Sequence, residues 1–145
     1  MAFDPQIIED SFEQAKPIAA DVADKFYEIL WADYPQSKAL FADANMAKQK
    51  MALMNSLTQI VDHVRDAEWL TDYLYKMGER HAKYGAQDEH FEWVGASLLK
   101  TFAHFFGDAW TDELQQNWLE AYQAIAGLML PGLSDGLKVA LKDTA

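Results

Sequence analysis

The chain has 145 residues, half of them hydrophobic, with five Trp, eight Phe and six Tyr, which is enough to form one domain with a sizeable core. Its formal net charge of −11 repels phosphate groups and anionic lipid headgroups, which argues against nucleic acid and membrane partners. It contains no cysteine, which excludes disulfides, thiolate catalysis, iron–sulfur clusters and haem attachment through Cys-x-x-Cys-His.

The first residues, Met1 to Pro5, lack a basic region followed by a long apolar run, so we expect no signal peptide. No stretch approaches the roughly 18 apolar residues that a membrane span needs. Together these features predict a cytoplasmic protein.

The hydrophobic positions follow a helical period almost throughout, and no alternating run rich in Val, Ile and Thr predicts a strand. The first part of the chain predicts helices over about 5–17, opened by Pro5, and over about 18–32. Pro35 then breaks the chain before a short helical turn that ends at Leu40.

The middle of the chain predicts two further helices. Asp43 or Asn45 can cap a helix over about 46–64. A second helix covers about 66–81, and Gly85 marks its exit.

The last part of the chain begins with Asp88, which we predict to cap a long helix that ends at Gly107. Thr111 caps the last main helix, and Pro131 is expected to end it. The tail 131–145 adds a short helical turn or frays.

These segments predict an all-α fold of seven or eight helices. No internal repeat, low-complexity tract or linker divides the chain, so we expect residues 1–145 to form a single domain. Its core covers about 5–130, and the short tail follows.

His81 is the residue that bears most on function. In a helix, Leu70, Leu74, Met77 and His81 share one face, which places an imidazole in line with an apolar stripe. A ring nitrogen that faces a hydrophobic interior needs a hydrogen-bond partner or a metal ion. The helix by itself leaves both possibilities open.

The sequence lacks the motifs that are typical of several other kinds of catalytic or metal-binding site. It has no glycine-rich phosphate loop, no Gly-x-Ser-x-Gly and no His-Glu-x-x-His. It also lacks any Glu-x-x-His, the signature of a di-iron carboxylate bundle. We assign no functional role to His63, His90 or His104.

An ordered series of residues accompanies His81 along the chain, and its order and spacing resemble the globin family. The similarity is to single-domain bacterial globins and to the globin domain of flavohaemoglobins, and it runs from about Phe12 to Leu130. The residues that carry it are Phe26-Tyr27, Trp31, Tyr34-Pro35, Leu40-Phe41, Gln49, Leu53, Arg80-His81, Lys83-Tyr84-Gly85, His90-Phe91 and Val94-Gly95.

This resemblance implies a globin fold that encloses a non-covalently held haem b. His81 would be the proximal iron ligand, and its other ring nitrogen would donate to a backbone carbonyl. The cations Arg80 and Lys83 are candidates to pair with the haem propionates. The residues expected to line the haem are Trp31, Phe41, Leu53, Met77, Phe91 and Val94.

On the opposite, distal side of the haem, the resemblance implies that Tyr27 and Gln49 donate hydrogen bonds and that Leu53 packs beside the bound gas. Dioxygen in such a site carries partial negative charge, which donors in a dry pocket stabilise more than they stabilise carbon monoxide. We therefore expect reversible dioxygen binding, for storage or transport, with carbon monoxide and nitric oxide as further ligands.

Two positions depart from the family pattern. Flavohaemoglobins carry a tyrosine where Phe91 stands and a glutamate near Leu133, and these groups make the proximal histidine more anionic. Phe91 and Leu133 cannot do so, which argues against a peroxidase-like role.

Three alternatives to reversible dioxygen binding stay open. The first is a nitric-oxide dioxygenase that uses an external reductase, because no flavin or nicotinamide domain follows in the sequence. The second is a haem-based gas or redox sensor, and the third is a haem-free helical interaction domain.

Overall fold

Six α-helices and three short 3-10 helices make up the chain in the computed structural model, which describes residues 3–144 and the side chains of residues 3–138. Over residues 3–144 there is no β-strand, so the predicted all-α fold is confirmed. The elements are α1 (Pro5–Ala15), η1 (Lys16–Ile18), α2 (Ala19–Asp33), η2 (Pro35–Phe41), α3 (Met46–Asp62), α4 (Ala67–Lys83), α5 (Asp88–Phe106), η3 (Gly107–Ala109) and α6 (Asp112–Thr144).

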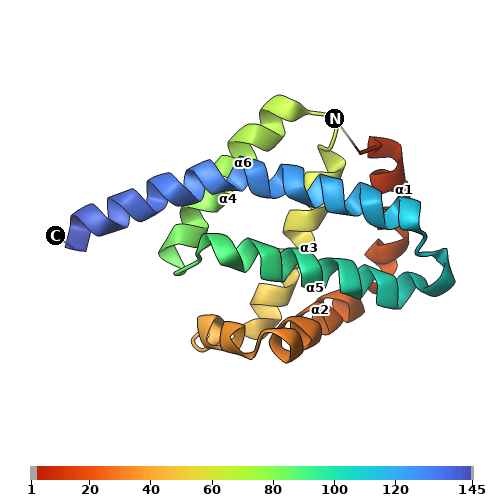
Figure 1. Ribbon diagram of the computed structural model, residues 1–145, viewed down its shortest axis with the longest axis horizontal. Coiled ribbons are helices and arrows are strands. Elements are labelled where there is room, and N and C mark those ends of the chain that lie inside the picture. The colour runs from red at the N-terminus through yellow and green to blue at the C-terminus, as the bar shows by residue number, and fades with distance from the viewer. Residues whose placement is uncertain (1–2, 145) are drawn as a thin grey trace.

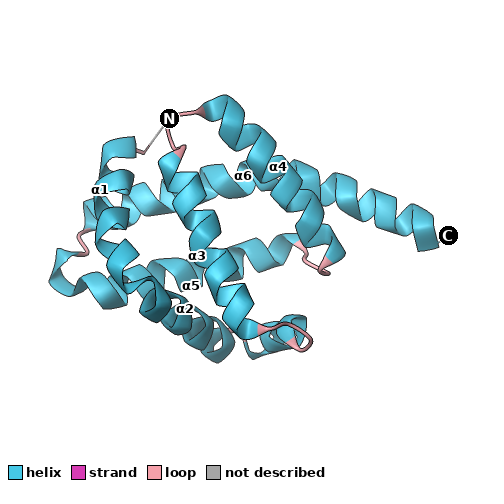
Figure 2. Cartoon of the chain, turned by 180° about the vertical axis from the view of Figure 1, so that it is seen from behind, coloured by secondary structure: helices cyan, strands magenta, loops and turns pink. Residues whose placement is uncertain are grey.

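Each helix has its own main packing partners, and the most extensive contact is that of α4 with α6. α5 and α6 run antiparallel and side by side, and the C-terminal part of α6 projects beyond the other helices (Figure 1). Seen from behind, α3 crosses in front of this pair (Figure 2). α4 packs chiefly on α6, whereas α3 packs on α2 and α1. The helices that carry Gln49 and His81 are therefore supported by different neighbours.

The buried side chains form two core clusters. The first core cluster joins α1, α2, α3, α5 and α6, and among its buried members are Phe12, Phe26, Tyr27, Leu30, Leu57, Leu98, Phe102 and Trp118. The second core cluster consists of Ile60, Leu74, Met77 and Met129, with Leu70, Tyr73, Phe91, Ile125 and Leu128 packed against it. Leu74, Met77 and Leu70 confirm the apolar stripe predicted for the helix that carries His81.

Helix caps explain most of the boundaries. Asp4 accepts from the Gln6 amide at 2.9 Å ahead of Pro5, and Asn45 accepts from the Lys48 amide at 3.3 Å. Thr111 accepts from the Leu114 amide at 3.1 Å, as predicted. These side chains satisfy amide groups that have no partner within the first turn of a helix.

The cap predicted at Asp88 is wrong by one residue. The N-cap of α5 is Gln87, and Asp88 is the first residue of the helix. The Gln87 backbone N–H donates to Nδ1 of His90 at 3.0 Å, so the imidazole closes the helix start from its third residue. Asp88 and Glu89 lie in the first turn, where negative charge is favourable.

The helix end predicted at Pro131 is also wrong, because α6 continues through Pro131 to Thr144. Proline inside a helix costs about 3 kcal/mol, so packing must offset that cost. Leu133, two residues later, is fully buried, and a β-carbon on Gly132 would lie 2.0 Å from the Tyr75 carbonyl oxygen of α4. The close contact with α4 thus holds the helix together beyond the proline.

The same continuation corrects the helix count. The expected seven or eight helices included the tail 131–145 as a separate short turn and the segment at Pro35 as another. The tail is part of α6 as far as Thr144, Ala145 lies outside the described residues, and the segment at Pro35 is a 3-10 helix. Within the described residues, no helix has the length and apolarity needed to cross a membrane.

The contact between α4 and α6 depends on glycine, and Gly78→Ala tests it. A β-carbon at Gly78 would lie 2.1 Å from the Met129 carbonyl oxygen, so the two backbones must separate. We expect the free energy of unfolding to fall by about 2 kcal/mol, measured by urea denaturation. Gly127→Ala is the matched control, since nothing lies within 4 Å of that position and the substitution should add about 1 kcal/mol. Equal stabilisation by both substitutions would show that the helices are not in close contact.

Candidate functional site

The turn between α2 and α3 carries Phe41 back to α2. Pro35 begins η2, and both the amide and the hydroxyl of Ser37 donate to the Tyr34 carbonyl, at 2.8 and 2.6 Å. Ser37 is buried, so these bonds hold the turn from within. The Phe41 ring then packs edge-on against Tyr27, with 5.3 Å between ring centroids.

Tyr27 and Gln49 meet although 22 residues separate them. Nε2 of Gln49, in the first turns of α3, donates to the hydroxyl oxygen of Tyr27 at 3.1 Å. Tyr27 is buried, and this burial raises its pKa, although the Gln49 hydrogen bond opposes the shift. The phenol therefore stays protonated near neutral pH and keeps its own O–H free to donate.

Trp31 lies one turn after Tyr27 on the same face of α2. Its ring centroid is 5.6 Å from that of Tyr27 and 6.1 Å from that of Phe41. The Lys38 ammonium lies 5.6 Å from the centre of the indole ring. Nε1 of Trp31 is buried and has no hydrogen-bond partner.

Leu53 on α3 and Val94 on α5 are half-buried and pack against the first core cluster, as do Trp31 and Phe41. Three of the predicted residues, Trp31, Phe41 and Gln49, contact Tyr27 itself.

His81 lies in the last turn of α4, half-buried, and its ring is bonded to its own helix. The distance from Nδ1 to the Met77 carbonyl oxygen is 2.7 Å. A carbonyl oxygen can only accept, so Nδ1 carries the proton, and the neutral ring has its lone pair on Nε2. The structure therefore holds this imidazole with Nε2 as the atom able to bind a metal ion.

The surroundings of His81 keep the ring neutral. Burial lowers its pKa, the hydrogen bond to Met77 opposes that shift, and the charge of Arg80 adds to it. α4 ends directly afterwards, since the amides of Tyr84 and Ala86 both donate to the His81 carbonyl and Gly85 has a φ of +84°. A φ in this range favours glycine, so the predicted exit at Gly85 is confirmed.

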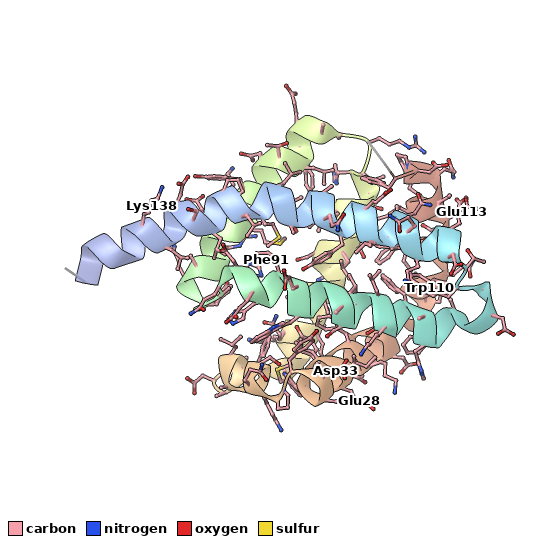
Figure 3. The ribbon with its side chains drawn as sticks, in the orientation of Figure 1. Glu28, Asp33, Phe91, Trp110, Glu113 and Lys138 are labelled. Atoms are coloured by element: carbon pink, nitrogen blue, oxygen red, sulfur yellow. The ribbon has the colours of Figure 1, made fainter. Side chains whose placement is uncertain are left out.

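Met77 and Phe91 lie with the second core cluster, apart from the residues around Tyr27. Met77 is buried there, and Phe91 packs against the cluster from the start of α5, where Figure 3 shows it between α5 and α6. Leu133 is fully buried on α6. Neither Phe91 nor Leu133 offers a side-chain hydrogen bond to His81.

The two predicted cations are exposed. Arg80 and Lys83 lie in the last turn of α4 together with His81. Positive charge there interacts favourably with the carbonyl end of the helix, which accounts for both residues locally.

The other three histidines have the following surroundings. His63 stacks on Trp69 with 3.5 Å between ring centroids, and its Nδ1 lies 2.8 Å from the Gln59 carbonyl oxygen. His90 caps α5, and His104 is exposed.

The sequence analysis assigned no role to two tyrosines that lie beside the predicted residues, Tyr122 and Tyr84. The Tyr122 hydroxyl donates to the Phe91 carbonyl at 2.6 Å, and burial raises its pKa. Its ring lies so near Gly95 that a β-carbon there would be 2.6 Å away. The Tyr84 ring packs edge-on to His81 with 5.9 Å between centroids. Tyr84 follows His81 by three residues, a helical spacing that could have indicated this contact, whereas nothing local links Tyr122 to Phe91.

Comparison with protein families gives one assignment, the family model described as Globin, which matches residues 24–129. Among curated proteins, the flavohemoprotein of Bacillus subtilis is 26% identical over 123 residues, which are 83% of this chain and 31% of that protein. The flavohemoprotein of Bordetella pertussis is 28% identical over 107 residues, covering 72% of this chain and 27% of that protein. The chain thus spans about 30% of the length of these relatives.

Solved structures agree with this assignment. A bacterial globin from Campylobacter jejuni superposes with a TM-score of 0.79 at 25% identity, over 90% of this chain and 94% of the other. An engineered carbene transferase from Rhodothermus marinus, based on a provisionally assigned nitric oxide dioxygenase, superposes with a TM-score of 0.84 at 22% identity. That superposition covers 94% of this chain and 95% of the other.

The lowered pKa of His81 predicts a pH dependence of stability in the cofactor-free protein. The unfolded chain takes up a proton near the ordinary value of 6.5, whereas the folded chain takes it up only at lower pH. The free energy of unfolding should therefore fall as the pH drops through this window. Urea denaturation at several values between about pH 7.5 and 5.5 measures this dependence.

In the variant His81→Gln, the free energy of unfolding should no longer show the pH dependence that His81 causes. His104→Gln, at an exposed position, is the control and should retain it. An unchanged pH profile in His81→Gln would contradict the burial of a neutral ring at this position.

Proposed function

The chain belongs to the globin family, and on this basis we propose that it holds a haem b through His81 and binds dioxygen reversibly. Haem binding is implied by membership of this family. When bound, the haem supplies an iron with an open coordination position for a diatomic gas. The absence of cysteine makes non-covalent attachment the fitting mode for this chain.

The observation that carries the proposal is the hydrogen bond from His81 Nδ1 to the Met77 carbonyl. It fixes the tautomer and the ring orientation, and leaves the Nε2 lone pair for iron. A neutral ring is required for this, and burial lowers the pKa of His81. The residue present thus fits the role of proximal ligand.

The core is divided into two clusters, and this division supports the proposal that a flat apolar group lies between them. Trp31, Phe41, Leu53 and Val94 pack with the first core cluster, and Met77 and Phe91 with the second. We propose that these six side chains line the haem. Arg80 and Lys83, exposed beside His81, are the proposed partners of the propionates, which need cations or water.

The pair formed by Tyr27 and Gln49 supports dioxygen as the ligand. Gln49 donates one N–H to the Tyr27 oxygen, which leaves the Tyr27 O–H and the second Gln49 N–H as donors. Dioxygen that is polarised in such a site would gain more from these donors than carbon monoxide would. Leu53, one helical turn after Gln49, would pack beside the gas.

The surroundings of His81 favour gas binding over cleavage of the O–O bond. Its Nδ1–H donates to a neutral carbonyl and not to a carboxylate, and Phe91 and Leu133 have apolar side chains. A neutral acceptor leaves the ring less anionic than a carboxylate would.

Nitric-oxide dioxygenation is a second candidate function. The relatives are named flavohemoproteins, a name that combines a flavin with haem. This reaction would combine nitric oxide, dioxygen and one electron to give nitrate, and an external reductase would supply the electron. We propose that the protein and this reductase act in the cytoplasm. Continuous nitric-oxide consumption that depends on added reductase would identify this activity. Stoichiometric loss of the oxygenated spectrum alone would not identify it, because it does not require turnover.

The His81→Ala variant tests the proximal ligand. We expect haem affinity to fall by at least about 100-fold, because the iron loses its protein ligand, and the Soret band of the purified protein to vanish. Absorption spectra of the ferric, ferrous and oxygenated forms measure this. His104→Ala is the control and should give a wild-type spectrum. Full haem retention by His81→Ala with an unchanged spectrum would refute the assignment.

The Tyr27→Phe variant tests the distal donor. Loss of a hydrogen bond to a polarised ligand in a dry site should raise the dioxygen dissociation rate about ten- to a hundredfold. Carbon monoxide dissociation should change much less, and flash photolysis with stopped-flow mixing measures both rates. Tyr73→Phe, which alters a half-buried tyrosine beside the second core cluster, is the control. An unchanged dioxygen rate in Tyr27→Phe would exclude Tyr27 as a donor.

A further inference from the structure

Trp31 has a buried N–H group with no acceptor. Among the described side chains, Trp31 Nε1 and Ser97 Oγ are the buried polar atoms that lack a hydrogen-bond partner. A serine hydroxyl in a helix can rotate toward the carbonyl one turn before it, whereas an indole N–H points in one direction and can only donate. Leaving such a donor buried and unpaired costs about 1–3 kcal/mol, so it calls for an acceptor.

The position of Trp31 narrows the choice of acceptor. Its ring packs against Tyr27 and Phe41, within the group of side chains around the Tyr27–Gln49 hydrogen bond. Among its aromatic neighbours Tyr27 and Phe41, only Tyr27 carries an oxygen atom, and this oxygen already accepts a hydrogen bond from Gln49. This part of the site therefore combines three donors, the phenol, the amide and the indole, and an electron-rich ligand would satisfy them.

We propose that the Trp31 N–H is a third hydrogen-bond donor on the distal side and that it increases the preference for dioxygen over carbon monoxide. This inference rests on the proposed function. A polarised dioxygen molecule has two oxygen atoms with lone pairs, so it can accept from more than one donor at once. Because the indole N–H is buried, its hydrogen bond would form without competition from solvent.

A haem propionate is the competing acceptor for this N–H. Propionates are ionised and lie where water or cations reach them, whereas Nε1 of Trp31 is shielded from solvent. The nearby cation, Lys38, lies over the indole ring and is exposed. We therefore assign the indole N–H to the gas and make the propionate an outcome of the test.

The first experiment compares gas dissociation from Trp31→Phe and from Trp110→Phe. Trp110 is the matched control, because its Nε1 already donates to Gln115 at 3.0 Å and it lies where α5 meets α6, at the far end of α5 from Phe91 (Figure 3). Trp31→Phe should release dioxygen about tenfold faster, with a much smaller change for carbon monoxide. Trp110→Phe should match the wild type in both.

Other outcomes overturn the proposal. Equal changes for dioxygen and carbon monoxide would show that Trp31 acts only by packing. Faster loss of haem with an unchanged ratio of the two gas rates would assign the N–H to a propionate.

The second experiment observes the indole N–H directly and needs no folded Trp31→Phe variant. The wild-type protein, with ¹⁵N-labelled tryptophan, gives five indole signals, and Phe variants of the other four tryptophans assign Trp31 by elimination. The Trp31 signal should lie further downfield in the oxygenated than in the carbonmonoxy form, since both forms are diamagnetic and differ in the acceptor. An identical position in the two forms would overturn the inference.

The same samples test the proposed function and the role of Trp31 separately. Wild-type protein that gives no Soret band with added haem would refute the proposed function, and this inference with it. Wild-type protein that binds haem and dioxygen, with no effect at Trp31, would refute this inference alone.

Discussion

The contact between α4 and α6 determines where His81 lies. Gly78 and Gly132 lack β-carbons, so the two backbones approach more closely than side chains would allow. α4 packs chiefly on α6, and the fully buried Leu74 and Leu133 belong to these two helices. His81 lies in the last turn of α4. The helix that positions the imidazole is therefore α6, the long last helix, and not α3.

The site combines opposite chemical tendencies on its two sides. On α4, the carbonyl of Met77 takes the His81 Nδ1 proton and leaves a lone pair on the other nitrogen. On α2 and α3, Tyr27 and Gln49 carry donors, and the Trp31 N–H has no partner. A lone pair on one side suits a metal ion, and donors on the other suit an electron-rich ligand. This asymmetry is what makes a gas-binding haem site the best account of the chain.

Much of this could be predicted from the sequence, because helix periods and caps act over a few residues. Asn45 and Thr111 cap the helices that were expected after them, and Gly85 marks the exit of α4. Trp31, Phe41 and Gln49 also contact Tyr27 in the structure. The error at Asp88 is of the same local kind, since a histidine three positions after Gln87 supplies a cap that propensity does not anticipate.

The helical segments and the apolar stripe of Leu70, Leu74 and Met77 follow from the sequence alone, and the residues proposed to serve a haem were chosen from it. The fold adds that α6 continues through Pro131, that Gln49 donates to Tyr27 and that the Trp31 N–H is left without an acceptor. The two sets of features differ because the forces behind them act over different distances along the chain. A proline signal and a cap are local, whereas the burial energy that overrides one, and the partners that a polar atom gains or lacks, come from segments distant in the chain.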